Sequence, residues 1–478
     1  MERIGRAVPV EELTRLVSGP VVTDPAALSP WHGDASHLSG TPVAAVRPEG
    51  TEEIRRVVRW ARRHRVPLVA RGGGTSLDGE CVPPNGGVVL DLSAWSSPLE
   101  IDPVERRARV GPGVVNRELQ RAAEPFGLFF PPNPGSWTSS TIGGNVATNA
   151  SGPRSYRYGP TRVWTSAATL VLGTGEVVTI GTAARKRSAG PDPVGFVVGS
   201  EGTLGILTEV VVRLAPTPPR RLALLVPVGD EERAVRLALR LDRARAPTLA
   251  AIEYVDRPSA AALSRAAARR LASEGPWVLL EVETTSEAEE GALTAIAGLI
   301  EGSGISEDPT VFPDADELWS LRGRSGTVLD GEVGPRVRED VAVPLTRLPE
   351  LFRLVHRIAD GAGVPLWVYG HLGDGHLHPN FGLDPAGEGA DRLRRELWQG
   401  VHALDGTVSG EHGVGLLKRE ALIAEHPPAA LAWMRAVKSA CDPDGILNPG
   451  KLYPPAPPDG GAASRSPSGR AADAARQG

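Results

Sequence analysis

Cysteine is almost absent from this chain of 478 residues. Its two cysteines, Cys81 and Cys441, are too few for a disulfide framework or for the thiolate ligands of an iron–sulfur cluster. The fold must therefore be stabilised by a hydrophobic core, and a chain of this length can bury an ample core in two or three domains.

Long apolar runs and a strong net charge are also missing. No apolar stretch approaches the roughly 20 residues that a membrane-spanning helix needs. We find no signal peptide, and the net charge of −5 is too mild to indicate a nucleic acid or an anionic membrane as partner. These absences favour a cytoplasmic protein with no nucleic acid partner and at most peripheral contact with a membrane.

Small and polar residues dominate residues 131–162, which read PPNPGSWTSSTIGGNVATNASGPRSYRYGPTR. This stretch shows neither a helical stripe nor strand alternation, so it predicts an ordered loop with short turns. Glycine lets a backbone approach a ligand closely, and Ser, Thr and Asn offer hydrogen bonds without charge. The combination suits a large, flat, polar cofactor with a diphosphate, and a structural Ω-loop is the alternative.

A second glycine-rich loop comes earlier, where the apolar strand P-L-V-A runs into R-G-G-G-T-S at residues 71–76. Successive glycine N–H groups can form a concavity that binds a diphosphate. No G-x-G-x-x-G opens a βαβ unit here, so the loop is not a Rossmann fingerprint. Around it we predict helices at residues 51–66 and 114–123, and strands at 88–92, 107–110, 167–172 and 177–180.

Three prolines, Pro216, Pro218 and Pro219, predict a domain boundary. Strands alternate with helices beyond it, which favours an antiparallel sheet covered on one face by helices. The predicted strands are 222–228, 249–254, 277–285, 305–311, 341–344 and 365–369, and the predicted helices are 231–245, 258–273, 287–302 and 351–358.

Histidines gather where the last of these strands runs into G-H-L-G-D-G-H-L-H-P-N-F. This motif holds His371, Asp374, His376, His378 and Asn380, and S-G-E-H-G follows about thirty residues later with Glu411 and His412. Two histidines and a carboxylate suit a zinc-like ion with an open position. The side chains of 376, 378 and 380 share one side of a strand, whereas residue 371 must turn in from the loop. A set of polar residues around a tight turn is the alternative.

The motifs P-P-N-P-G-S, T-I-G-G-N-V-A-T-N-A-S-G and Y-G-P-T-R closely resemble the flavin-binding domain of the FAD-linked oxidases of vanillyl-alcohol oxidase type. The chain resembles the D-lactate, glycolate and D-2-hydroxyglutarate dehydrogenase branch over roughly residues 40–453. This resemblance implies an α+β fold, with a two-subdomain flavin-binding domain and a ferredoxin-like cap domain built on an antiparallel sheet.

The resemblance also implies a domain order. Residues 1–40 are an accessory segment, 41–218 bind FAD, 219–404 form the substrate or cap domain, and 405–453 return to the FAD domain. Residues 454–478 contain Pro, Gly, Ala and Ser with almost no bulky apolar side chains, so they predict a disordered tail.

FAD is the cofactor that the resemblance implies, held without a covalent bond. Some relatives carry a histidine near the first loop that bonds to the flavin, and this chain has Thr75 and Ser76 there. The FAD-binding residues implied by the family pattern are Arg71, Gly72, Gly73, Gly74, Thr75, Ser76, Pro132, Gly135, Ser140, Thr141, Gly143, Gly144, Asn145, Thr148, Asn149, Gly152, Tyr158, Gly159, Glu201, Gly202, Gly205, Ile206 and Asn448.

The same resemblance assigns the second set of motifs to a metal ion and a substrate. It makes His371, His378 and Glu411 the ligands of a divalent ion, expected to be zinc, and makes His412 the general base. His376 stands where relatives usually have asparagine, so it either alters the site or adds a fourth imidazole. The implied substrate-binding residues are Arg322, Arg338 and Asn380, with Arg324 as a further candidate.

These residues predict an FAD-dependent dehydrogenase that oxidises a D-2-hydroxy acid to the 2-oxo acid, with hydride passing to flavin N5. With no iron–sulfur ligands or haem motif, the chain would need an external acceptor such as a quinone, a cytochrome or an electron-transfer flavoprotein. The alternatives are an oxygen-using oxidase, a non-catalytic flavin-binding subunit of a glycolate oxidase-like complex, and a metallohydrolase, which would leave residues 131–162 unexplained. The oligomeric state stays open, with a homodimer as one option.

Overall fold

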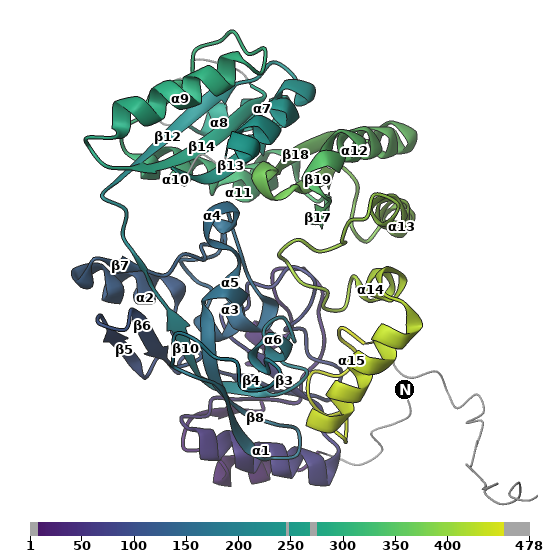
Figure 1. Ribbon diagram of the computed structural model, residues 1–478. Helices are drawn as coiled ribbons and strands as arrows, with labels where there is room; N and C mark the ends of the chain where they lie inside the picture. The colour runs from purple at the N-terminus through teal and green to yellow at the C-terminus, as the bar shows by residue number, and fades with distance from the viewer. Residues whose placement is uncertain (1–7, 245–247, 268–274, 454–478) are drawn as a thin grey trace, which may run out of the picture.

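The computed structural model describes residues 8–244, 248–267 and 275–453. Figure 1 shows two bodies, one built from the elements up to β11 and the other from β12 to α13. The last helices, α14 (Arg419–Glu425) and α15 (Pro428–Cys441), lie back beside the first body, where Leu447 bridges to Leu68. The tail predicted to be disordered lies outside the described residues.

The first body begins with a small sheet of order β1-β2-β4-β3. Strands β2 and β3 both run parallel to β4, and helix α1 (Thr51–His64) buries Ile54, Val57 and Val58 in the same hydrophobic core. Strand β3 ends at Arg71, so the sheet delivers the first glycine-rich loop at its edge. The strands are β1 (Val21–Val22), β2 (Ala44–Val46), β3 (Leu68–Arg71) and β4 (Val88–Asp91).

A second, antiparallel sheet completes this body in the order β5-β6-β10-β8-β9. Its predicted hairpin is confirmed, with Val171 paired to Val177. The strands are β5 (Leu99–Asp102), β6 (Arg107–Val110), β8 (Thr165–Val171), β9 (Val177–Gly181) and β10 (Ile206–Arg213). Helix α2 (Asn116–Ala123) packs into its core, and β7 (Leu128–Phe129) pairs with β11 (Ala215–Pro216).

Residues 131–162 contain more helix than predicted. The structure forms α3 (Ile142–Thr148), α4 (Ser155–Tyr158) and α5 (Thr161–Trp164) within this stretch. The Thr141 side chain accepts a hydrogen bond from the Gly144 N–H at the start of α3, and Asn149 ends it with φ of 54°. Helices this short complete too few turns to produce a hydrophobic stripe, which is why the pattern predicted only a loop.

The second body is built on one large antiparallel sheet of order β15-β12-β14-β13-β18-β19-β16, with β17 also paired to β19. This sheet confirms the antiparallel cap expected from the alternation of elements. Its strands are β12 (Arg220–Pro227), β13 (Leu249–Val255), β14 (Trp277–Thr284), β15 (Thr310–Phe312), β16 (Val337–Arg338), β17 (Val341–Ala342), β18 (Leu366–Gly370) and β19 (His376–Phe381).

Helices cover both faces of this sheet, so the prediction of one covered face was wrong. Strand β12 shows the reason, because Leu222 and Leu224 belong to one hydrophobic core whereas Ala223 and Leu225 belong to another. The first face carries α7 (Glu231–Ala244), α9 (Glu289–Glu301), α12 (Leu348–Ala362) and α13 (Glu388–His402). The second carries α8 (Arg257–Ala266), α10 (Ala315–Arg322) and α11 (Ser325–Val333).

The second face of the sheet is polar where it meets the first body. On β19, Leu377 and Phe381 pack into the core beneath α7, α9, α12 and α13. The side chains of His376, His378 and Asn380 therefore lie on the second face, as the alternation along a strand predicts. On β14, Glu281 and Glu283 accept bonds from the α4 region of the first body, from Arg154 Nε at 3.0 Å and from Tyr158 Oη at 2.6 Å. The candidate site lies on this polar face, around His376, His378 and Asn380.

Candidate active site

A cavity of about 1100 Å³ extends between the two bodies. Its walls include the first glycine-rich loop after β3, the segment before and within α3, and the histidine cluster on β19. Ligand pockets usually measure about 300–1,000 Å³, so this space exceeds what a small substrate needs and can also hold a large cofactor. A smaller cavity of about 70 Å³ adjoins the loop that carries Glu201 and Gly202.

Most residues of the predicted FAD site line one of these two cavities. They are Arg71, Gly72, Gly73, Gly74, Thr75, Ser76, Gly135, Ser140, Thr141, Gly143, Gly144, Asn145, Thr148, Glu201, Gly202 and Gly205. The remaining ones, Pro132, Asn149, Gly152, Tyr158, Gly159, Ile206 and Asn448, are not among the lining residues, and their flavin contacts stay predictions.

The glycines of the first loop pack against the second loop. A Cβ at Gly72 would lie 2.3 Å from Thr141 Oγ1, and one at Gly73 would lie 2.2 Å from the Ser139 carbonyl oxygen. Any side chain at these positions would force the two loops apart. The glycine pattern therefore builds the cavity wall itself, in addition to any close approach to a ligand.

Two unpartnered polar atoms support a polar cofactor in the large cavity. Ser140 Oγ and Asn145 Nδ2 are buried, line the cavity and have no hydrogen-bond partner within the described residues. Buried polar groups are nearly always paired, so a ligand with hydrogen-bonding groups is favoured here. These uncharged groups and the glycine-rich backbone fit FAD.

Asn448 and Tyr158 are engaged elsewhere. Asn448 Nδ2 donates to the carbonyl oxygens of Glu80 and Glu201 at 3.0 and 2.6 Å. These bonds tie the C-terminal segment to two segments that line the smaller cavity. Tyr158 Oη donates to Glu283 in the second body. In this structure both side chains connect segments of the protein.

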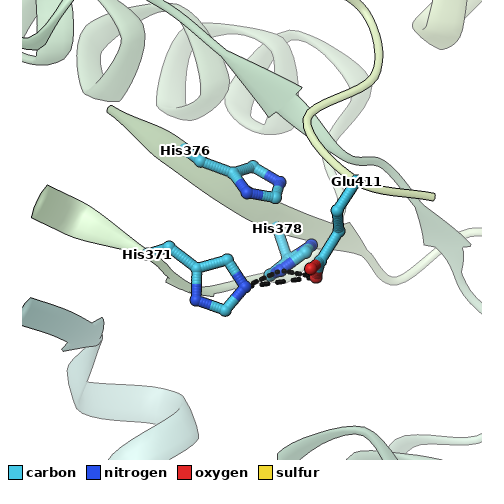
Figure 2. A group of neighbouring side chains, drawn as sticks. All are labelled: His371, His376, His378 and Glu411. Atoms are coloured by element: carbon cyan, nitrogen blue, oxygen red, sulfur yellow. Dashed lines mark hydrogen bonds and ion pairs between the residues drawn. The ribbon is translucent and has the colours of Figure 1, made fainter. Parts of the chain in front are cut away.

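Three side chains converge in a geometry suited to a metal ion (Figure 2). His371 Nε2 lies 3.1 Å and His378 Nε2 3.3 Å from Glu411 Oε1, and the two nitrogens are 3.5 Å apart. A tetrahedral ion with bonds of about 2.0–2.1 Å would hold its ligand atoms about 3.3 Å apart. His371, His378 and Glu411 therefore fit a zinc-like ion, with a further position left for substrate.

His376 belongs to the same cluster but has a separate partner. Its Nε2 is 2.5 Å from Asp340 Oδ1, while its ring centroid lies 4.5 Å from that of His378. With this bond present, only Nδ1 of the ring is left for an ion. The departure from the usual asparagine thus adds an imidazole that is held by a buried aspartate.

The electrostatics of this cluster favour a positive charge. Burial alone would lower the pKa of His371, but Glu253 and Glu411 raise it to about 10. Burial would raise the pKa of Glu411, yet His371 and His378 hold it well below its usual range. Burial and the neighbouring His376 hold the pKa of His378 well below its usual range. A cation between these groups, as a proton or as a metal ion, is therefore favourable.

His412 lies beside the cluster on the cavity wall. Its ring stacks on His378 at a centroid distance of 5.1 Å, and its Nε2 is 3.9 Å from Glu411 Oε1. Burial lowers the pKa of His412 more than Asp340 and Glu411 raise it. The lowered pKa favours the neutral imidazole, which is the form that can accept a proton.

Asp340, which no sequence motif singled out, organises the loop that carries Glu411 and His412. Its fully buried carboxylate accepts hydrogen bonds from the backbone N–H of Glu411 at 3.2 Å and of His412 at 2.9 Å. It also accepts from Ser409 Oγ and forms an ion pair with Lys418. One carboxylate from the second body thus shapes the backbone of both site residues.

Glu253 on β13 is a second residue that sequence reasoning missed. It lies 2.6 Å from His371 Nδ1 and 2.7 Å from Arg322 Nη2. Both contacts join segments far apart in the chain. The only signal available was a single acid in the apolar strand L-A-A-I-E-Y-V, since a buried acid needs a partner.

The predicted substrate residues differ in their surroundings. Arg322 lines the cavity with its guanidinium 4.9 Å from the Tyr369 ring centroid, and Arg338 lines it while paired to Asp330. Asn380 also lines it, and its Oδ1 accepts from the buried Arg336 at 2.9 Å, a contact that the sequence did not indicate. The further candidate, Arg324, is not among the lining residues.

We expect Asp340→Asn to weaken zinc binding by about 10–100-fold, the usual effect of losing a partner behind metal ligands. The backbone N–H groups of Glu411 and His412 now donate to the Asp340 carboxylate. An asparagine offers them only one acceptor oxygen, and its NH2 group cannot accept. The measurement is the zinc dissociation constant, obtained by competition with a chelator.

The matched control is Asp256→Asn, a buried aspartate whose carboxylate accepts from the N–H groups of Ser259 and Val368 instead of from the loop of Glu411 and His412. It should bind zinc like the wild type. A folded Asp340→Asn variant with wild-type zinc affinity would show that Asp340 does not support this loop.

Two family models match the chain. An FAD binding domain matches residues 42–181, and the C-terminal domain of FAD linked oxidases matches residues 217–452. No helix in the described ranges is both long enough and apolar enough to cross a membrane.

Relatives with curated names span most of the chain. Glycolate oxidase subunit GlcD of Bacillus subtilis is 34% identical, over 86% of this chain and 89% of its own length. D-2-hydroxyglutarate dehydrogenase of Stutzerimonas stutzeri is 32% identical, over 93% and 98%. D-lactate dehydrogenase of Archaeoglobus fulgidus is 34% identical, over 85% and 90%.

Solved structures show the same fold at lower identity. A 4-ethylphenol oxidase from Gulosibacter chungangensis has a TM-score of 0.74 at 21% identity, covering 93% of this chain and 97% of its own. For p-cresol methylhydroxylase the TM-score is 0.77 at 17% identity, with 93% and 96% covered. The α+β architecture is thus that of the vanillyl-alcohol oxidase type. The chain belongs to the FAD-linked oxidases and is an FAD-dependent oxidoreductase, on the branch that contains glycolate oxidase and the D-2-hydroxy acid dehydrogenases.

Proposed function

We propose that the protein is a dehydrogenase that oxidises a D-2-hydroxy acid to the corresponding 2-oxo acid. One observation carries the proposal: His371, His378 and Glu411, spaced for a metal ion, lie on the same cavity as the glycine-rich loops of the FAD-binding region. The relatives named D-lactate dehydrogenase and D-2-hydroxyglutarate dehydrogenase support this substrate class.

FAD would be held by the loops at residues 71–76 and 131–152, without a covalent link because Thr75 and Ser76 replace a flavin-bonding histidine. A divalent ion, expected to be zinc, would be held by His371, His378 and Glu411. When bound, the flavin supplies a hydride acceptor and the ion polarises the substrate hydroxyl.

The chain's own residues bind and orient the acid. Arg322 offers its guanidinium to the carboxylate, because its Nε is buried with no hydrogen-bond partner among the described residues and its Nη2 pairs with Glu253. Arg338 and Asn380 lie on the same wall, and Arg336 fixes the Asn380 side chain. These contacts would present the hydroxyl to the metal ligands and the α-carbon to the flavin side of the cavity.

His412 would take the hydroxyl proton. The substrate loses this proton and its α-hydrogen as hydride, which turns the alcohol carbon into a carbonyl. A neutral imidazole beside Glu411 is suited to this transfer, because burial keeps its pKa lowered. Asp340 holds the His412 backbone N–H at 2.9 Å and so fixes the position of the base.

The electrons would leave to a quinone, a cytochrome or an electron-transfer flavoprotein, and we place the reaction in the cytoplasm. One relative is named as a subunit of glycolate oxidase, which favours a second candidate, a flavin-binding subunit that needs a partner for activity. The full metal triad and His412 favour a chain that is catalytic by itself. A homodimer is compatible with either.

The experiment that tests the function mixes the purified FAD-loaded chain with a panel of D- and L-2-hydroxy acids without air. We expect at least one D-acid to bleach the visible flavin band and its L-isomer to leave the band unchanged. Dithionite bleaching is the control for a reducible flavin. If dithionite bleaches the flavin but no panel member does, the isolated chain is not this dehydrogenase. Rapid recovery of the band in air would instead indicate an oxidase.

We expect His412→Asn to retain zinc and FAD but to slow flavin reduction by a saturating substrate by about 10²–10⁴-fold, the usual contribution of a positioned base. Asparagine keeps a polar group of similar reach and cannot accept the proton. Stopped-flow absorbance measures the rate, and elemental analysis measures the zinc. Loss of zinc would make His412 a ligand, and reduction at the wild-type rate would remove it from the mechanism.

A further inference from the structure

Glu253 is a fully buried carboxylate on the face of the sheet that meets the cavity. Its neighbours along β13, Ile252 and Tyr254, pack into the opposite core, so its own side chain points toward the polar face. Burying an ionised carboxylate is costly unless partners replace its water. The partners of Glu253 therefore indicate what the residue does.

Each oxygen of Glu253 has a different partner. Oε1 lies 2.6 Å from Nδ1 of His371, and Oε2 lies 2.7 Å from Nη2 of Arg322. Arg322 itself packs over the Tyr369 ring. Because the arginine occupies one oxygen, the carboxylate cannot turn away from the histidine without losing an ion pair.

The contact at Nδ1 determines what the other nitrogen of His371 can do. A neutral imidazole carries one N–H, and a carboxylate at Nδ1 places the hydrogen there. When a metal ion takes the place of the second ring proton, Nε2 presents its lone pair to that ion, and this is the atom that lies 3.1 Å from Glu411 Oε1 and 3.5 Å from His378 Nε2. Metal-binding histidines generally have such a partner behind them.

We propose that Glu253 is a positioning residue that sets the tautomer and orientation of His371 for metal binding, and that Arg322 locks Glu253 in that role. The inference rests on the proposed metal site and adds to it a residue from another strand. It also joins the metal ligand to the arginine assigned to the substrate, since both depend on one carboxylate.

The Glu253→Gln substitution distinguishes two roles of Glu253, which are the orientation of His371 and the pairing with the charge of Arg322. A glutamine has one carbonyl oxygen, and the positive charge of Arg322, whose Nη2 lies 2.7 Å from this position, favours that oxygen over the amide NH2. The amide NH2 must then face His371 Nδ1, which has to accept, so the ring hydrogen moves to Nε2 and blocks the metal position. Arg322 keeps a partner, whereas Nε2 of His371 carries a hydrogen and cannot bind a metal ion.

The matched control is Glu281→Gln on the neighbouring strand β14. Glu281 is 1% exposed and pairs with two arginines, Arg154 at 3.0 Å and Arg221 at 2.9 Å. The Glu281→Gln substitution removes a buried carboxylate of the same sheet that has arginine partners. It leaves the side chains around His371 unchanged.

The test uses the full FAD-loaded chain, freed of metal and then titrated with zinc against a chromophoric chelator. We expect Glu253→Gln to bind zinc about 10–100-fold more weakly than the wild type, and Glu281→Gln to bind it normally. A second readout is the visible spectrum of the cobalt-loaded chain, which should change for Glu253→Gln and not for Glu281→Gln.

Wild-type zinc affinity and an unchanged cobalt spectrum in Glu253→Gln would overturn the inference and leave the proposed function standing. A wild-type chain that takes up no zinc would overturn both. If Glu253→Gln does not fold with FAD bound, Glu253→Asp replaces it. That variant keeps the charge but is one methylene too short to reach both partners, and it should also bind zinc more weakly, with normal affinity again contradicting the inference.

Discussion

Burying carboxylates beside histidines is the constraint on which this site depends. Glu253 and Asp340 are both fully buried, and each would cost several kcal/mol if it lacked partners. Asp340 meets this requirement with backbone N–H groups of the loop that carries Glu411 and His412, and Glu253 meets it with His371 and Arg322. The geometry of the cluster is thus a consequence of satisfying two buried charges.

The large sheet brings these groups together because it buries both faces. Alternate residues of β12 and β19 pack into the helix-covered core on the first face of the sheet. The second face is apolar near α10 and polar near the cavity. Lys418 extends this arrangement to the first body, since its Nζ pairs with Asp340 at 3.4 Å and with Asp78 at 3.1 Å, shortly after the first glycine-rich loop. Lys418 therefore links the segment that follows the first glycine-rich loop to the carboxylate that holds the loop of Glu411 and His412.

Local patterns predicted many of the elements and the side of the strand on which the motif residues lie. The helix at residues 51–66, the hairpin after residue 165 and the alternation of His376, His378 and Asn380 all follow from period and turn residues. The second helical layer on the sheet, the short helix α3, and Glu253, Asp340 and Arg336 were missed. Helix α3 completes too few turns to show a stripe, and the others depend on contacts between distant segments, such as the 118 residues that separate Glu253 from His371.

A crystal structure of the FAD-loaded chain with zinc, recorded on both sides of the zinc absorption edge, tests the central claim most directly. The account predicts one anomalous peak bonded to Nε2 of His371, Nε2 of His378 and the Glu411 carboxylate, with Glu253 still at His371 Nδ1 and the flavin ring on the same cavity. An ion bound elsewhere, or none at this cluster in a chain that retains its flavin, would contradict it.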